Sequence, residues 1–145
     1  MLSKSMARLF FMGGTIVTFA IFLALSWNTV FNDVPKNTHP ENITPQVISG
    51  KHLWEKNNCM GCHTLMGEGG YYAPELTKVV ERRGEGFIKA VLMSKEPWQP
   101  RGRKMVAYGF SDKEAKDLFE FLKWVGETNL NGFPKKPDFK TTSNK

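Results

Sequence analysis

The sequence predicts an all-α protein that consists of one amino-terminal membrane-spanning helix followed by one small helical domain. Residues 9–31 form a run of 23 residues without a formally charged side chain, rich in Phe, Ile, Leu and Val. Apolar residues after Ser111 recur at the spacing of one helix face, and no segment alternates apolar and polar residues as a half-buried strand does. With 145 residues, the chain has room for one compact domain besides the apolar run.

The apolar run is long enough to cross a membrane. As a helix it would span about 35 Å at ~1.5 Å per residue, which exceeds a bilayer core of roughly 30 Å. Lys4 and Arg8 precede the run, whereas Asp33 and Lys36 balance each other after it. Because positive residues favour the cytoplasmic side, the amino terminus is expected in the cytoplasm. We therefore predict a single-pass protein of the cytoplasmic (inner) membrane, in contact with lipid, with its domain in the periplasm.

A cleaved signal peptide is the alternative interpretation of the same run. Ala24-Leu25-Ser26 offers a small-x-small cleavage pattern after an apolar stretch. The run is long for a signal peptide, however, and Trp27 is typical of the aromatic residues at a membrane interface. An uncleaved anchor is the favoured prediction.

The rest of the chain divides by composition. Three prolines lie among Asn, Thr and Asp between residues 32 and 46, which is typical of an extended linker. Helical spacing of apolar residues follows over 47–58 and 86–94, and Ser111 with Glu114 forms a capping-box pattern at the start of a third helix. The predicted organisation is an anchor over 1–31, a linker over 32–46, a domain over 47–132 and a tail over 133–145.

Charge and cysteine content exclude two classes of protein. The chain has 20 basic and 14 acidic residues, a formal net charge of +6, and the basic residues are spread among acidic ones. No basic stripe alternates with aromatic residues, so nucleic acid is not an expected partner. The sequence contains two cysteines, close together, which is too few for the disulfide framework of a small secreted domain.

The two cysteines belong to the segment Cys59-Met60-Gly61-Cys62-His63, the attachment pattern of a c-type haem. At this spacing the two thiols form thioethers to the haem vinyl groups, and the adjacent His63 binds iron as an axial ligand. A redox disulfide would need an α/β context that the sequence lacks, and zinc would need a fourth ligand at an unusual spacing. The predicted fold is therefore an all-α, cytochrome c-like haem domain behind the anchor, with one covalently bound haem c.

Groups around the haem are predicted from their distance to the attachment pattern. A metal-bound histidine donates its second ring N–H to an acceptor, and Pro74 lies where small cytochromes c place the carbonyl that accepts it. A simple turn proline is the alternative. Arginine suits the haem propionates because its guanidinium can bind a carboxylate through two hydrogen bonds. The residues expected around the haem edge are Tyr71, Tyr72, Arg82, Arg83 and Arg101.

The second axial ligand determines whether the iron transfers electrons or binds gases. Met60 and Met66 are too close in sequence to His63 to reach the opposite haem face. Met93 falls on the apolar face of a predicted helix, where Met is commonly core filling. Met105 lies in a glycine-containing loop just before the capped helix and is the predicted ligand, with His52 as a bis-histidine alternative. A His/Met pair favours electron transfer, so this chain is expected to be a non-catalytic electron-transfer subunit.

The residues after the haem pattern resemble the cytochrome c subunit of bacterial nitric oxide reductase. The similarity is carried by the run G-E-G-x-Y-x-A-P-E-L within residues 63–76, and it extends through residues 81–84, 103–105 and 108–112. In that family, Cys59 and Cys62 match the attachment residues, and His63 and Met105 match the axial ligands. The resemblance also implies a calcium ion at the subunit interface, to which backbone carbonyls of Gly69 and Tyr71 contribute.

The resemblance implies a respiratory enzyme of denitrification in which this chain supplies electrons. Its expected partners are a large polytopic catalytic subunit with b-type haems and non-haem iron, which reduces NO to N2O, and a soluble periplasmic cytochrome c or cupredoxin as donor. The alternative is an anchored mono-haem cytochrome c that serves a haem-copper oxidase or acts as a respiratory electron shuttle.

Overall fold

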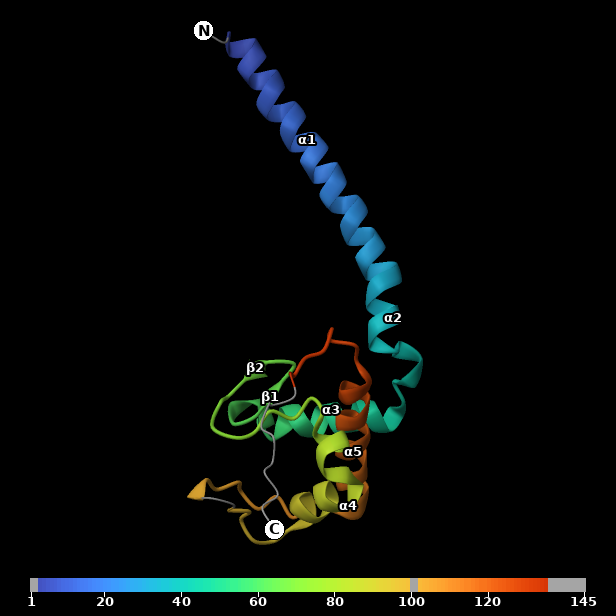
Figure 1. The fold of residues 1–145 in the computed structure, drawn as a ribbon, viewed down its shortest axis with the longest axis vertical. Coiled ribbons are helices and arrows are strands. Elements are labelled where there is room, and N and C mark those ends of the chain that lie inside the picture. The colour runs from blue at the N-terminus through green and yellow to red at the C-terminus, as the bar shows by residue number, and fades with distance from the viewer. Residues whose placement is uncertain (1–2, 100–101, 136–145) are drawn as a thin grey trace, which may run out of the picture. The chain divides into compact units, whose positions relative to one another are not determined.

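The computed structural model describes residues 3–99 and 102–135 (Figure 1). The chain forms two compact units, Met1–Asn37 and Thr38–Lys145. The described residues are mostly helical, which confirms the predicted all-α class. The strands that do occur are two-residue segments, β1 (Thr64–Leu65) and β2 (Glu68–Gly69), which pair in an antiparallel hairpin that the sequence analysis did not predict.

The first unit is one long apolar helix. α1 (Lys4–Asn28) is capped by Ser3, whose Oγ accepts a hydrogen bond of 3.3 Å from the Met6 backbone N–H. A π-helical turn, Thr29–Asp33, then joins α1 directly to α2 (Val34–Thr38). The continuous helix Lys4–Thr38 has the length and composition to cross a membrane, and its apolar window buries no residue against protein. It is a candidate membrane anchor.

The prediction of an extended linker over residues 32–46 is wrong for its first half, because the helix continues to Thr38. Pro35 lies inside this continuous helix, directly after a π turn in which the Val34 N–H donates to the Thr29 carbonyl, and this wider turn accommodates a proline that has no N–H. The second half is a 3₁₀ turn, Pro40–Asn42, that packs on the domain: Trp124 Nε1 donates to the His39 carbonyl at 3.3 Å. This part of the chain is attached to the domain.

Three helices build the second unit. α3 (Pro45–Lys56) begins after Thr44, whose hydroxyl accepts from the Val47 N–H at 3.3 Å. α4 (Val79–Met93) begins seven residues before the predicted position at 86 and bends at Gly84, whose φ of 72° interrupts the helix. α5 (Asp112–Glu127) has the predicted capping box, with both reciprocal bonds between Ser111 and Glu114.

The core lies where α3 and α4 pack against α5 (Figure 1). Gly50 of α3 sits directly on α5, because a Cβ at this position would overlap the Asp117 carbonyl and approach the Phe121 Cβ to 2.7 Å. Buried Asp117 accepts hydrogen bonds from Ser49 Oγ at 2.8 Å and Lys113 Nζ at 2.7 Å. The close crossing continues to the end of α3, where the ring centroid of Trp54 lies 6.1 Å from that of Phe121, and the attachment segment follows directly after α3.

Gly50→Ala is expected to destabilise the domain by about 1–3 kcal/mol, the usual cost of inserting a methyl group into a closely packed contact. The matched control is Gly86→Ala, because a Cβ at Gly86 meets nothing within 4 Å and the position is helical. Alanine there should be neutral or stabilising by up to ~1 kcal/mol. Thermal unfolding of the detergent-solubilised chain measures both, and equal melting temperatures for the two variants would contradict the close crossing.

Candidate haem site

The attachment residues lie on one tight turn at the end of α3. Asn58 adopts a left-handed conformation with φ of 49°, which turns the chain into a 3₁₀ segment, Cys59–Gly61. The Cys62 N–H donates to the Cys59 carbonyl at 3.2 Å and the His63 N–H to the same carbonyl at 2.9 Å. Cys59 is buried and Cys62 is exposed, and both are free thiols. The turn therefore places the two sulfurs and the histidine on one short segment of backbone.

The His63 ring is oriented by the backbone. Its Nδ1 lies 2.8 Å from the carbonyl oxygen of Pro74, the partner that the sequence analysis predicted. Its ring centroid lies 6.4 Å from that of Trp54. Burial lowers the pKa of His63, and the Pro74 hydrogen bond opposes this only in part. A neutral ring whose Nδ1–H faces a carbonyl leaves Nε2 as the nitrogen that can bind a metal.

The Cys59 thiol is buried, and its sulfur is hydrogen-bonded to Tyr108. Burial raises its pKa to about 11, and a hydrogen bond with the Tyr108 hydroxyl only partly offsets this. A thiol with a raised pKa is largely protonated at neutral pH, so Cys59 lacks the lowered pKa of a reactive redox cysteine. Tyr108 is a site residue that the sequence analysis did not single out, because it lies far along the chain from Cys59 and no spacing rule connects them.

The loop that carries Met105 is tied to the loop that follows His63. Met105 is half-buried against the core and exchanges two backbone hydrogen bonds with Trp98, of 3.1 and 2.8 Å. Tyr72 connects the loops: Arg103 Nη1 donates to the Tyr72 carbonyl at 2.6 Å, and the Lys104 N–H donates to its hydroxyl at 3.1 Å. The other candidate methionines, Met60, Met66 and Met93, are exposed.

Other predicted site residues have different partners. Tyr71 is 82% exposed, and its hydroxyl lies 3.4 Å from the Gly67 carbonyl. Arg82 contacts Glu75, and Arg83 lies over the Phe87 ring at 5.1 Å from its centroid. The arginine that contacts Tyr72 is instead Arg103, which the sequence analysis did not assign to the haem surroundings. Arg101 lies outside the described residues.

The bis-histidine alternative receives no support from the position of His52. This residue is exposed on α3, and its Nδ1 lies 3.7 Å from a carboxylate oxygen of Glu55.

The residues present fit a haem. The two free thiols and the oriented His63 are the groups that covalent attachment and axial ligation need. Trp54, whose ring lies next to that of His63, has a buried Nε1 with no hydrogen-bond partner among the described residues. Buried N–H groups are normally paired, so this donor is available to a polar group of a haem. Large apolar side chains of the loops after the attachment segment are also exposed and could be covered by a haem. These are Met66, Tyr72, Trp98 and Val106.

Fold and site together define the class of protein as a cytochrome c with covalently bound haem, and residues 47–126 match the cytochrome c family. Curated relatives extend the similarity beyond this domain. The C subunit of the nitric oxide reductase of Halomonas halodenitrificans is 41% identical over 94% of this chain and 96% of its own length. Proteins of the same name from Stutzerimonas stutzeri and Paracoccus denitrificans are 38% and 37% identical over 91% and 92% of this chain.

The chain belongs to the family of nitric oxide reductase C subunits. The resemblance found in residues 63–76 is thereby confirmed, as are the cytochrome c domain and the haem c that it implies. The chain is an electron-transfer cytochrome subunit whose amino-terminal helix is a candidate membrane anchor.

Proposed function

We propose that this chain is the electron-input subunit of a membrane-bound nitric oxide reductase. It accepts electrons one at a time from a soluble periplasmic cytochrome c or cupredoxin. It passes them to a large polytopic catalytic subunit, with b-type haems and non-haem iron, that reduces NO to N2O. The observation that carries the proposal is the identity of 37–41% to relatives named as the C subunit of nitric oxide reductase, over more than nine-tenths of both chains.

In this proposal Cys59 and Cys62 would hold the haem through their sulfurs, and His63 and Met105 would be the ligands of its iron. When bound, the haem supplies a one-electron couple at iron. Pro74 keeps the His63 ring in one orientation through the bond to Nδ1. Tyr72 fixes the Met105 loop against the attachment loop, so that both ligand-bearing segments keep their spacing during electron transfer.

The proposed topology follows from the charges that flank the apolar helix. Lys4 and Arg8 precede the candidate span, so the amino terminus lies in the cytoplasm and the haem domain in the periplasm. A soluble periplasmic donor can then reach the domain. We keep the anchor over 1–31, the domain over 47–132 and the tail over 133–145 as part of the proposal.

The last part of the proposal is a calcium ion at the interface with the large partner, with backbone carbonyls of Gly69 and Tyr71 as ligands. Within residues 3–99 and 102–135, no group of three or more His, Cys, Asp or Glu side chains is placed to hold a metal ion. The partner would therefore supply further oxygen ligands for such an ion, and a calcium chelator should weaken the association of the two subunits.

The test is to isolate the chain from membranes under mild detergent conditions and to record NO consumption with a reduced electron donor. Rapid consumption by a preparation that contains a large polytopic partner is the expected result. An intact, reducible complex that consumes no NO would replace the proposal by an oxidase-linked cytochrome or a free electron shuttle. The covalent haem would remain in either case.

A further inference from the structure

The carbonyl that accepts the His63 hydrogen bond lies in a segment held on both flanks. Before Pro74, the Ala73 N–H donates to the Cys62 carbonyl at 2.8 Å. After it, the Leu76 N–H donates to the Thr64 carbonyl at 2.9 Å. Residues 73–76 therefore lie along the attachment loop. The position of the Pro74 carbonyl depends on the contacts that hold Glu75, the next residue.

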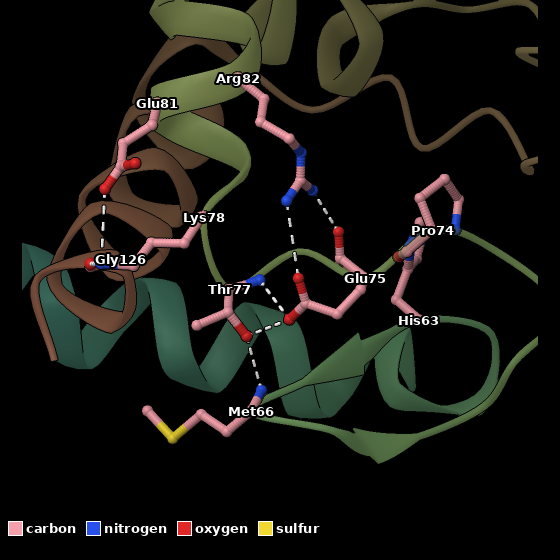
Figure 2. A network of polar contacts seen from close by, with 9 residues as sticks. All are labelled: His63, Met66, Pro74, Glu75, Thr77, Lys78, Glu81, Arg82 and Gly126. Carbon is pink, nitrogen blue, oxygen red and sulfur yellow. Dashed lines mark hydrogen bonds and ion pairs between the residues drawn. The ribbon is translucent and has the colours of Figure 1, made fainter. Parts of the chain in front are cut away.

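Glu75, directly after Pro74, is the centre of a polar network (Figure 2). Its Oε1 accepts hydrogen bonds from the Thr77 hydroxyl and from the Thr77 N–H, the latter at 2.7 Å. Arg82 of α4 donates from Nη2 to the Glu75 carbonyl, and its Nη1 lies 3.6 Å from Glu75 Oε2. The Thr77 hydroxyl also accepts from the Met66 N–H at 2.6 Å. Thr77 and Arg82 thus fix the carboxylate of Glu75, and Arg82 also fixes its backbone carbonyl.

The network is anchored in the core. Thr77 is fully buried, and its carbonyl lies so close to α5 that a Cβ on Gly126 would approach it to 3.0 Å. Lys78 Nζ donates to the Gly126 carbonyl, which adds a second link between this segment and α5. Glu75 Oε2 is itself buried and accepts no hydrogen bond within the described residues, so the nearby Arg82 guanidinium supplies its compensation. A network anchored at buried Thr77 has little freedom to shift without breaking bonds.

We propose that Glu75, held by Thr77 and Arg82, is a positioning residue that fixes the Pro74 carbonyl against His63 and thereby sets the reduction potential of the haem. A strong bond from Nδ1–H to a carbonyl makes the imidazole a more basic ligand, which stabilises ferric over ferrous iron and lowers the potential. Loosening the network weakens this bond and raises the potential. The inference rests on the proposed role of His63 as axial ligand.

The test is a potentiometric titration of the haem in the full chain in detergent, with Glu75→Leu and Glu75→Gln compared. Leucine removes both the acceptor for Thr77 and the ion pair with Arg82, whereas glutamine keeps an acceptor oxygen. Glu75→Leu should shift the reduction equilibrium about tenfold towards the ferrous form, which is ~59 mV upward for a one-electron couple. Glu75→Gln should stay within about threefold of the wild type, since the Thr77 bonds persist.

Two controls separate positioning from charge and from misfolding. Glu85→Gln removes a charge from an exposed residue of α4, the helix that carries Arg82, and should leave the potential unchanged. Thr77→Val and Thr77→Ser change no charge: valine should raise the potential and speed hydrogen exchange at His63 Nδ1, read by NMR, and serine should restore both. This pair decides the question if Glu75→Leu does not fold.

Three outcomes would overturn the inference. Equal shifts for Glu75→Leu and Glu75→Gln would show an effect of charge alone. A wild-type potential in haem-bearing Glu75→Leu or Thr77→Val would show that the network does not act on the iron. A wild-type chain without haem would overturn the assignment of His63, and the inference with it.

Discussion

Replacing both Cys59 and Cys62 by serine is expected to abolish covalent haem attachment, the largest effect of any change considered. Serine has a similar size but no thiol, so neither thioether can form. The reduced, denatured wild-type chain should retain haem on a gel, whereas the variant should lose it completely. Haem staining and the pyridine haemochrome spectrum of the purified chain measure the difference.

Met60→Leu is the matched control because Met60 lies between the two cysteines and its side chain is exposed. It should keep full attachment and an unchanged spectrum. The double-serine chain should also be less stable, because Cys59 is buried in the same core as Trp54 and a haem would extend that core. A double-serine chain that still carried haem after denaturation would contradict the attachment assignment.

Local signals explain the parts of the fold that the sequence predicted well. The capping box at Ser111 depends on residues three apart, and the structure contains both of its bonds. The His63–Pro74 bond joins a motif to a proline at a characteristic distance, and that contact is also present. These features are visible in sequence because each depends on residues near each other in the chain.

Features that depend on tertiary contacts escaped the sequence analysis. The linker was expected to be extended because of its prolines, but Pro35 lies directly after a π turn inside a continuous helix, which composition alone does not reveal. The start of α4 was placed late because Gly84 interrupts the pattern, although the helix resumes after a bend. Arg82 was predicted at the haem edge from its chemistry, and the contact of its guanidinium with Glu75 is one that its sequence position did not reveal.

Replacing Met105 by histidine is expected to lower the haem potential on the order of 200 mV, about a quarter of the range that axial ligands cover. A thioether is a soft, neutral ligand that favours ferrous iron, whereas a second imidazole favours the ferric state. The potential and the low-spin absorption spectrum should both change, while covalent attachment through the cysteines is kept. A potentiometric titration of the detergent-solubilised chain makes the measurement.

Met93→Leu is the control that distinguishes Met105 from the other candidate methionine ligand, Met93. Met93 ends α4 and is exposed, so leucine there should leave the potential and the spectrum as in the wild type. Met105 instead lies half-buried in a loop that Tyr72 joins to the attachment loop through Arg103 and Lys104. If Met105→His left the potential unchanged while Met93→Leu altered it, the ligand would lie on α4. The contacts of Tyr72 would then stabilise a surface loop and have no part in keeping the iron six-coordinate.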